Sequence, residues 1–238
     1  MRGTYGFELS ESCSACKLKG RGFFCQLPPA ALKDLDAVKF TSAYPKDAVL
    51  FMEKQAPRGI YVLCEGEIKL SINSSEGKTL ILRIARPGEV LGLMAALSGT
   101  PYEVTAEALR PCQVAFVRRE NFVRFLAQHP EANQAIIEQL GSQYHTACEQ
   151  IRTLGLSTSV TEKLARLLLD WSAGAAVTKA GTRTKLPLTH EEIAEFIGTT
   201  RESVTRALSE FKNRQLVIVQ GSTLTIPNRA ALENCVSA

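Results

Sequence analysis

The stretch 188–211 restricts the fold of this chain more than any other, because it contains the signals for two short helices joined by a tight turn. Thr189 followed three residues later by Glu192 forms a capping box, which marks the start of a helix. Gly198 supplies the residue that most easily takes the left-handed conformation at a helix end. A second helical pattern begins directly afterwards, so the stretch predicts a helix-turn-helix.

The second helix of this motif has one apolar and one polar face. Thr199 or Thr200 can cap it, and Val204, Leu208 and Phe211 form its buried stripe. The polar face begins at the helix N-terminus, the end of a recognition helix that reaches base edges in the major groove. The residues that we expect to contact DNA are Thr199, Thr200, Arg201, Glu202, Ser203, Thr205 and Arg206.

The chemistry of this polar face suits base recognition. Arginine can donate two hydrogen bonds to guanine, glutamate can accept one from the cytosine amino group, and threonine can contact a thymine methyl. The alternative is a solvated face on which Glu202 and Arg206 form a weak i,i+4 pair. Two short apolar runs follow, at 216–219 and 223–226, around Gln220-Gly221-Ser222. They predict a hairpin wing, which favours the DNA-binding interpretation.

Composition narrows the class of protein further. The 238 residues are 45% hydrophobic, which is enough for one or two cored domains, and we expect two. The net charge of +4 is modest for a nucleic-acid binder, so affinity should come from a local basic patch on each of two protomers. No segment has the roughly 20 apolar residues of a membrane span, and the N-terminus lacks a secretory signal pattern. We therefore expect no membrane partner, a cytoplasmic location, and seven cysteines that serve as thiols or metal ligands.

The rest of the chain predicts an α+β protein with an N-terminal antiparallel β-roll of the jelly-roll type. Short apolar runs broken by glycine and proline extend from about residue 35 to 119. A long helix should follow Pro130, and its apolar positions step by three and four residues, as in a helix that faces a partner helix. The expected dimer seam is Ile137, Leu140, Tyr144, Ala147, Ile151 and Leu154. The alternative is a helix that packs only on its own β-roll.

These features divide the chain into four expected parts. They are an N-terminal cysteine-bearing segment at 1–26, a β-roll sensor domain at 27–129, a dimerisation helix at 130–156, and a winged helix-turn-helix domain at 157–238. A dimer of such chains would present two helix-turn-helix motifs, the reading heads, related by a two-fold axis, which suits a palindromic DNA site.

The order of parts and three motifs resemble the Crp/Fnr family of transcriptional regulators. The motifs are R-E-S-V-T-R at 201–206, P-G-E-V-L-G-L at 87–93 and T-A-E-A-L at 105–109. The resemblance covers nearly the whole chain and implies a homodimer that binds double-stranded DNA, with RNA polymerase as a partner. It places Arg201, Glu202 and Arg206 at base-reading positions, and Arg201 implies a half-site related to TGTGA more than to TTGAT.

The sensor end departs from the cyclic-nucleotide binders of this family and is more similar to the Fnr branch. Where those binders have a glutamate for the ribose, an arginine for the phosphate and a serine or threonine beside it, this chain has Leu93, Glu103 and Val104. A carboxylate in a phosphate site would repel the ligand, so we expect cyclic AMP to bind poorly or not at all. Another small molecule in the β-roll remains open.

The cysteines carry a second resemblance, to the oxygen sensor of this family. That protein holds a [4Fe-4S] cluster with three N-terminal cysteines and one distant cysteine, as four thiolates can do. The corresponding ligands here are Cys13, Cys16, Cys25 and Cys112. The second gap is eight residues where the oxygen sensor has five. Structural zinc, direct thiol redox chemistry and no cofactor stay open as alternatives, and Cys64 and Cys148 are expected to be packing residues.

We therefore expect a DNA-binding regulator whose affinity is set by an N-terminal sensor. A ligand-binding module that acts on a protein partner, with the helix-turn-helix as a docking surface, is the alternative. An enzyme is the least favoured class. The histidines, His129, His145 and His190, have no nucleophile signature near them, and the chain has no phosphate-binding glycine loop.

Overall fold

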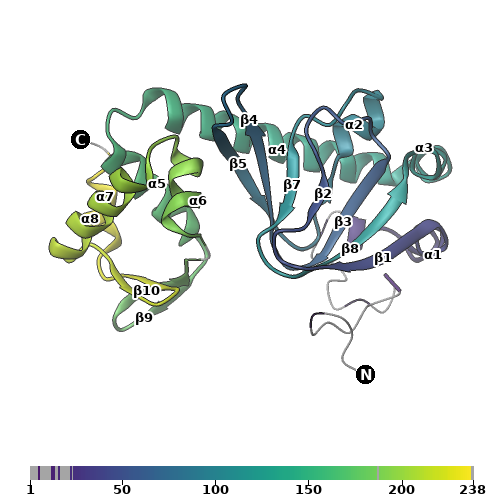
Figure 1. Ribbon diagram of the computed structural model, residues 1–238. Coiled ribbons are helices and arrows are strands. Elements are labelled where there is room, and N and C mark those ends of the chain that lie inside the picture. Colours follow the sequence, from purple (N-terminus) through teal and green to yellow (C-terminus); the bar gives the residue numbers. More distant parts are fainter. Residues whose placement is uncertain are drawn as a thin grey trace. The chain divides into compact units, whose positions relative to one another are not determined.

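The computed structural model describes residues 5, 12, 13, 16, 22, 24–186 and 188–236. The chain divides into two compact units (Figure 1). The first comprises Met1–Lys78 and Leu82–Thr146, and the second comprises Thr79–Ile81 and Ala147–Ala238.

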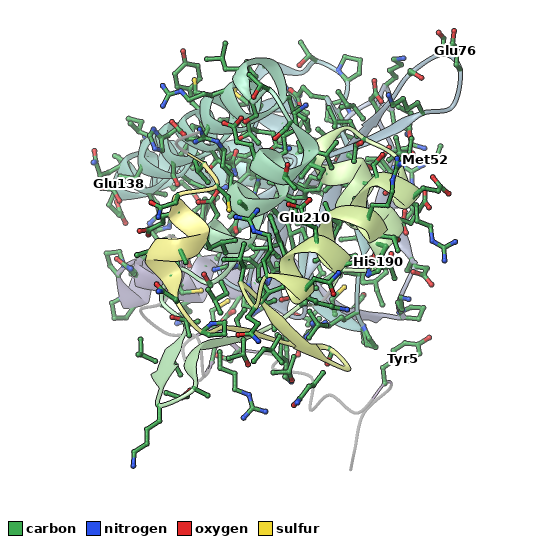
Figure 2. All side chains as sticks on the ribbon, turned by 90° about the vertical axis from the view of Figure 1, so that its left-hand side faces the viewer. Tyr5, Met52, Glu76, Glu138, His190 and Glu210 are labelled. Atoms are coloured by element: carbon green, nitrogen blue, oxygen red, sulfur yellow. The ribbon has the colours of Figure 1, made fainter. Side chains whose placement is uncertain are left out.

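The first unit is built on two antiparallel sheets of four strands each. One has the order β1-β8-β3-β6 and the other the order β2-β7-β4-β5, which confirms the expected β-roll (Figure 1). The turn between β4 and β5 carries Glu76 at its tip (Figure 2). The strands are β1 (Lys39–Tyr44), β2 (Val49–Phe51), β3 (Gly59–Glu65), β4 (Ile68–Asn73), β5 (Thr79–Ala85), β6 (Val90–Leu91), β7 (Thr105–Ala108) and β8 (Cys112–Arg118).

The first sheet is buried on both faces, and its side chains alternate between two separate cores. Tyr61 and Leu63 of β3 belong to the core between the two sheets. Ile60 and Val62 belong to a second core on the other face. Helices α1 (Pro29–Val38) and α3 (Arg119–Gln128), with the start of α4 (Glu131–Leu156), complete that second core. Because strand side chains alternate in direction, neighbouring residues of one strand enter different environments.

Helix α4 runs without a break through Gly141, as expected for the long helix. Its start is fixed to the first sheet by Gln139, which is 1% exposed and hydrogen-bonds to both backbone groups of Val90. Ile137, Tyr144 and Ile151 are each more than 60% exposed. Although α4 has 26 residues, no helix of the described residues is long and apolar enough to cross a membrane.

The expected seam positions of α4 do not all share one environment. Ala147 is exposed like Ile137, Tyr144 and Ile151, whereas Leu140 packs partly against the core under the first sheet. Leu154 is half-buried.

The second unit contains three main helices, a short helix and a four-stranded sheet of order β11-β12-β10-β9. Its helices are α5 (Val160–Trp171), α6 (His190–Ile197), α7 (Arg201–Asn213) and α8 (Arg229–Glu233). Its strands are β9 (Ala176–Thr178), β10 (Gly181–Lys185), β11 (Ile218–Gln220) and β12 (Thr223–Ile226). The expected hairpin wing is present, and β9 and β10 extend it beyond the two strands that the sequence predicts.

Candidate DNA-binding surface and thiol site

Helices α6 and α7 form the predicted helix-turn-helix, and local hydrogen bonds set its boundaries. The Thr189 hydroxyl accepts from the Glu192 backbone N–H, and the Glu192 carboxylate accepts from the Thr189 backbone N–H, so the capping box is complete. Gly198 ends α6 with φ of 64°. Thr200 caps α7, since its hydroxyl accepts from the Ser203 backbone N–H at 3.3 Å. The turn therefore follows from signals within a few residues of it.

The buried stripes of the two helices leave one face of α7 open. Ile193 and Ile197 of α6 are buried, as are Val204, Leu208 and Phe211 of α7. His190 begins α6, and Glu210 lies in the last turns of α7 (Figure 2). The expected DNA contacts that are exposed are Thr200, Arg201, Glu202, Thr205 and Arg206, whereas Thr199 and Ser203 are half-buried.

Hydrogen bonds organise the polar face of α7. The Thr205 hydroxyl donates to the Arg201 carbonyl at 2.9 Å and lies 2.9 Å from His190 Nδ1, so that nitrogen is the donor of the pair. Arg206 Nη2 donates to Ser203 Oγ at 3.4 Å. Within residues 188–236, Glu202 and Arg206 form no ion pair with each other, unlike the alternative considered from the sequence. The sequence does not predict the hydrogen bond between His190 and Thr205, because the two residues are 15 positions apart.

Three of the expected cluster cysteines lie around one small cavity in the first unit. Cys13, Cys16 and Cys25 line a space of about 20 Å³, and Cys64 of β3 lines it too. The remaining lining residues are Phe24, Leu35, Lys39, Val62, Leu63, Ala115 and Val117. The cavity lies on the helix-covered face of the first sheet, since Val62, Ala115 and Val117 belong to the core there.

Side chains of α1 and β1 fix the position of Cys13 at the cavity. The Cys13 backbone N–H donates to both carboxylate oxygens of Asp36, at 2.9 and 3.0 Å, and the Cys16 N–H donates to the Cys13 carbonyl. Lys39 Nζ lies 2.6 Å from Asp36 and donates to Cys13 Sγ at 3.0 Å, although its side chain is only 5% exposed. A buried ammonium group thus faces the thiols.

The segment that carries Cys25 is also held tightly against the roll. The short 3-10 helix Phe24–Gln26 buries Phe24, whose ring lies 6.1 Å from that of Phe122. Gly22 lies against Gly88 so closely that a Cβ atom at Gly22 would come within 2.4 Å of the Gly88 backbone. A larger residue at Gly22 would displace the segment.

Cys112 is not brought to this group, which corrects the ligand set that the resemblance implied. It is fully buried in the core between the two sheets, with Val114 of the same strand. Ala115 and Val117 point to the opposite face, where the three N-terminal cysteines lie. Strand alternation therefore places Cys112 on the wrong face of β8 and Cys64 on the right face of β3.

Burial dominates the titration of these thiols. It raises the pKa of Cys13 to about 11, although the hydrogen bond from Lys39 opposes the rise. It raises the pKa of Cys64 to about 12, and the nearby Cys13, Cys16 and Cys25 thiols add to the effect. Burial likewise raises the pKa of Cys25. These thiols therefore keep their protons at neutral pH unless a bound metal displaces them. Among the described residues, no group of three or more His, Cys, Asp or Glu side chains is arranged to hold a metal ion.

The interior of the β-roll is filled by aromatic rings. The rings of Phe51 and Tyr102 stack with centroids 4.1 Å apart, and Tyr61 lies 5.3 Å from Phe51. The buried Tyr102 hydroxyl donates to the Gly59 carbonyl at 2.8 Å and accepts from the Arg58 backbone N–H. These aromatic side chains belong to the core between the two sheets.

The three positions that the resemblance assigned to nucleotide binding lie in different environments. Leu93 is buried in the helix-covered core, and Val104 packs against the core between the sheets. Glu103 is exposed, so the expected desolvation of a buried carboxylate does not apply to it. Its repulsion of a phosphate would be reduced by solvent.

The two units correspond to two known domain families. Residues 41–129 match the cyclic nucleotide-binding domain, and residues 162–235 match the Crp-like helix-turn-helix domain. A β-roll of the first kind followed by a reading head of the second defines a DNA-binding transcriptional regulator. The chain belongs to the Crp/Fnr family of such regulators.

Relatives across the whole chain agree with this assignment. The chain is 26% identical over 205 residues to the transcriptional activatory protein AadR of Rhodopseudomonas palustris, covering 86% of this chain and 84% of that protein. It is 24% identical to the nitrogen fixation regulation protein FixK of Bradyrhizobium diazoefficiens, covering 95% and 94%. The solved structure of FixK2 from Bradyrhizobium japonicum superposes with a TM-score of 0.74 at 25% identity, covering 84% of this chain and 98% of that one. These relatives are regulators and not enzymes.

Proposed function

We propose that the protein is a homodimeric regulator that reads a palindromic DNA site with α7 and responds to redox state or oxygen through its N-terminal cysteines, without cyclic AMP. The observation that carries the proposal is the open polar face of α7, where Arg201 and Arg206 are exposed at the N-terminal half of the helix. This is the part of a recognition helix that reaches base edges. RNA polymerase is the further partner that regulation of transcription requires.

The dimer part of the proposal rests on α4. Ile137, Tyr144, Ala147 and Ile151 lie three or four residues apart and are exposed. Large apolar side chains at that spacing expose a stripe that a second α4 can cover. Two reading heads related by a two-fold axis would then contact two half-sites about one turn of DNA apart.

The sensor part rests on the cysteines and on the nucleotide-binding positions of the roll. Three N-terminal cysteines line one cavity beside a buried lysine, so a thiol-bound group there would be tied to α1 and β1. Leu93, Glu103 and Val104 offer neither the ribose-binding glutamate nor the phosphate-binding arginine that cyclic AMP binders use. Both observations favour a signal read at the cysteines over a nucleotide read in the roll.

The experiment that tests the DNA-binding part is selection of bound duplexes from a random library, followed by fluorescence anisotropy on the selected site. Replacing Arg206 by Ala should weaken binding by about 1–3 kcal/mol and relax the preference at one base pair per half-site, because a bidentate contact to guanine is lost.

Arg214→Ala is the matched control, because Arg214 is also exposed and caps the far end of α7, where its partner is Glu210. It should leave the sequence preference unchanged. If Arg206→Ala keeps the full selectivity of the native protein, the assignment of the reading face is wrong. If the native protein binds its partner without dependence on salt, a docking function on a protein replaces the DNA function.

A further inference from the structure

The cavity beside the N-terminal cysteines contains one thiol more than the sequence resemblance supplies. Cys64 lines it together with Cys13, Cys16 and Cys25, and its side chain packs with Cys13 against the helix-covered core. Cys64 comes from strand β3 of the first sheet, while the others come from the N-terminal segment. A group bound by all four would therefore join that segment to the β-roll.

The register of the sheet explains why Cys64 and not Cys112 reaches the cavity. Val62 of β3 is paired with Ala115 of β8, and both line the cavity or its core. Cys64 lies two residues beyond Val62, at a register shift between Leu63 and Glu65, and its side chain packs against the same core as Val62. Cys112 lies three residues before Ala115, which is an odd number, and so it faces the core between the sheets. Moving Cys112 to the cavity would require β8 to shift by one residue against both of its neighbours, β1 and β3.

A buried lysine donates a hydrogen bond to one of the cavity thiols. Lys39 is nearly fully buried, and its ammonium group donates to Cys13 Sγ at 3.0 Å. Asp36 fixes both partners, because it accepts from the Cys13 backbone and pairs with Lys39. Because the Asp36 carboxylate already balances the Lys39 charge, Lys39 acts on a bound group as a hydrogen-bond donor to the Cys13 sulfur.

A single zinc ion and a [4Fe-4S] cluster place different demands on four thiolates. A single zinc ion needs its ligands within about 2.3 Å of one point, and none of the described cysteine groups is arranged to hold one ion. In a [4Fe-4S] cluster each iron takes its own thiolate, so the ligands stand further apart around a larger core. The cavity of about 20 Å³ is small for such a core, and its walls would have to part on assembly.

We propose that Cys64, and not Cys112, is the fourth thiolate of a [4Fe-4S] site whose other ligands are Cys13, Cys16 and Cys25, with Lys39 as a buried hydrogen-bond donor to the Cys13 sulfur. The inference rests on the proposed redox function and specifies the site that serves it. It makes the β3 strand, at the centre of the first sheet, part of the sensor.

The experiment compares Cys64→Ser with its matched control Cys112→Ser. Full-length proteins are reconstituted anaerobically with ferrous iron and sulfide, and iron, sulfide, zinc and the visible absorbance are measured on each. The native protein and Cys112→Ser should each hold about four iron and four sulfide per protomer. Cys64→Ser should lose most of both while its far-ultraviolet circular dichroism stays native.

Several outcomes would overturn the inference. Full iron and sulfide content in Cys64→Ser would do so, as would equal loss in Cys112→Ser, or zinc without sulfide in the native protein. If Cys64→Ser does not fold, Ala115→Cys in the same variant decides, because Ala115 lines the same cavity. Regained cluster in that double variant supports the site, and continued absence overturns it.

Selective DNA binding, measured in parallel on cluster-free native protein, separates this inference from the proposed function. A protein that reads its site but never holds iron refutes only the thiol site.

Discussion

The hydrogen bonds between Gln139 and Val90 give a quantitative test of how α4 is attached to the sensor domain. Val90 lies on β6, which is an edge strand of the first sheet. Leu63 of the neighbouring strand β3 bonds to the residues before Val90, since its N–H donates to the Glu89 carbonyl and its carbonyl accepts from the Gly88 N–H. The N–H and C=O of Val90 therefore point away from the sheet, and the Gln139 amide satisfies both, at 3.0 and 2.7 Å.

Replacing Gln139 by Leu should cost about 2–4 kcal/mol of folding free energy. The variant leaves two buried backbone groups without partners, each worth about 1–3 kcal/mol, and the leucine recovers part of this by burying apolar surface. Since single changes above about 4–5 kcal/mol are exceptional, we expect the lower part of the summed range. Relative to a typical stability of about 5–15 kcal/mol, the loss is large.

The assay has to report on the first unit separately. The chain has one tryptophan, Trp171, and it lies on α5 in the second unit, so its fluorescence follows that unit. Hydrogen exchange of peptides around Val90, measured by mass spectrometry in increasing urea, follows the first. In Gln139→Leu the Val90 amide should exchange faster in native buffer, and the unfolding midpoint of its peptide should fall.

Gln134→Leu is the control, because Gln134 lies one turn earlier on α4, is exposed, and bonds only to Glu138. It should change stability by less than about 0.5 kcal/mol. If the two leucine variants are equally stable, or if Val90 keeps its protection in Gln139→Leu, the buried amide is not what fixes α4 to the roll.

Two further predictions concern α4 and the element before it. Tyr144→Asp should convert the dimer to a monomer in analytical ultracentrifugation and reduce the affinity for a palindromic site. Thr146→Asp, at an exposed neighbouring position, should do neither. A Tyr144→Asp variant that remains dimeric would contradict the proposed seam. Burial disfavours the charged form of His129, but its contacts with Asp34 at 2.9 Å and Glu131 at 3.1 Å raise its pKa above 6.5. The raised value means that this stabilisation is fully present below about pH 6.5 and is lost as pH rises through the folded pKa. His129→Gln should therefore flatten the pH dependence of the unfolding free energy above pH 6.5, and an unchanged slope would count against the contacts.

Local signals predicted the reading head well. The capping box at Thr189, the left-handed Gly198 and the stripe of Val204 and Leu208 all act within four residues along the chain, and the structure confirms each of them. The one choice left open, Thr199 or Thr200 as the cap, depends on the same local hydrogen bond, and the structure assigns it to Thr200. The dimer that would use this head remains a prediction.

The sensor could be predicted only in outline. Glycine and proline residues showed where the strands end. Strands β3 and β8 of the first sheet are apolar on both faces, so the spacing of apolar residues does not show on which face of the sheet a side chain lies. The sequence therefore could not show that Cys112 faces the core between the sheets, away from the N-terminal cysteines. Lys39 and His190 were missed because their partners are 26 and 15 residues away in sequence.

The sequence by itself determined the elements of this regulator: two capped helices with a wing, a long helix, and a roll of short strands. These follow from hydrogen bonds and side-chain spacing over one or two turns, which the residues of each segment set on their own. Only the tertiary structure decided which thiols meet. The register of β3 against β8, and the alternation of side chains across that sheet, carry Cys64 to the N-terminal cysteines and Cys112 away from them.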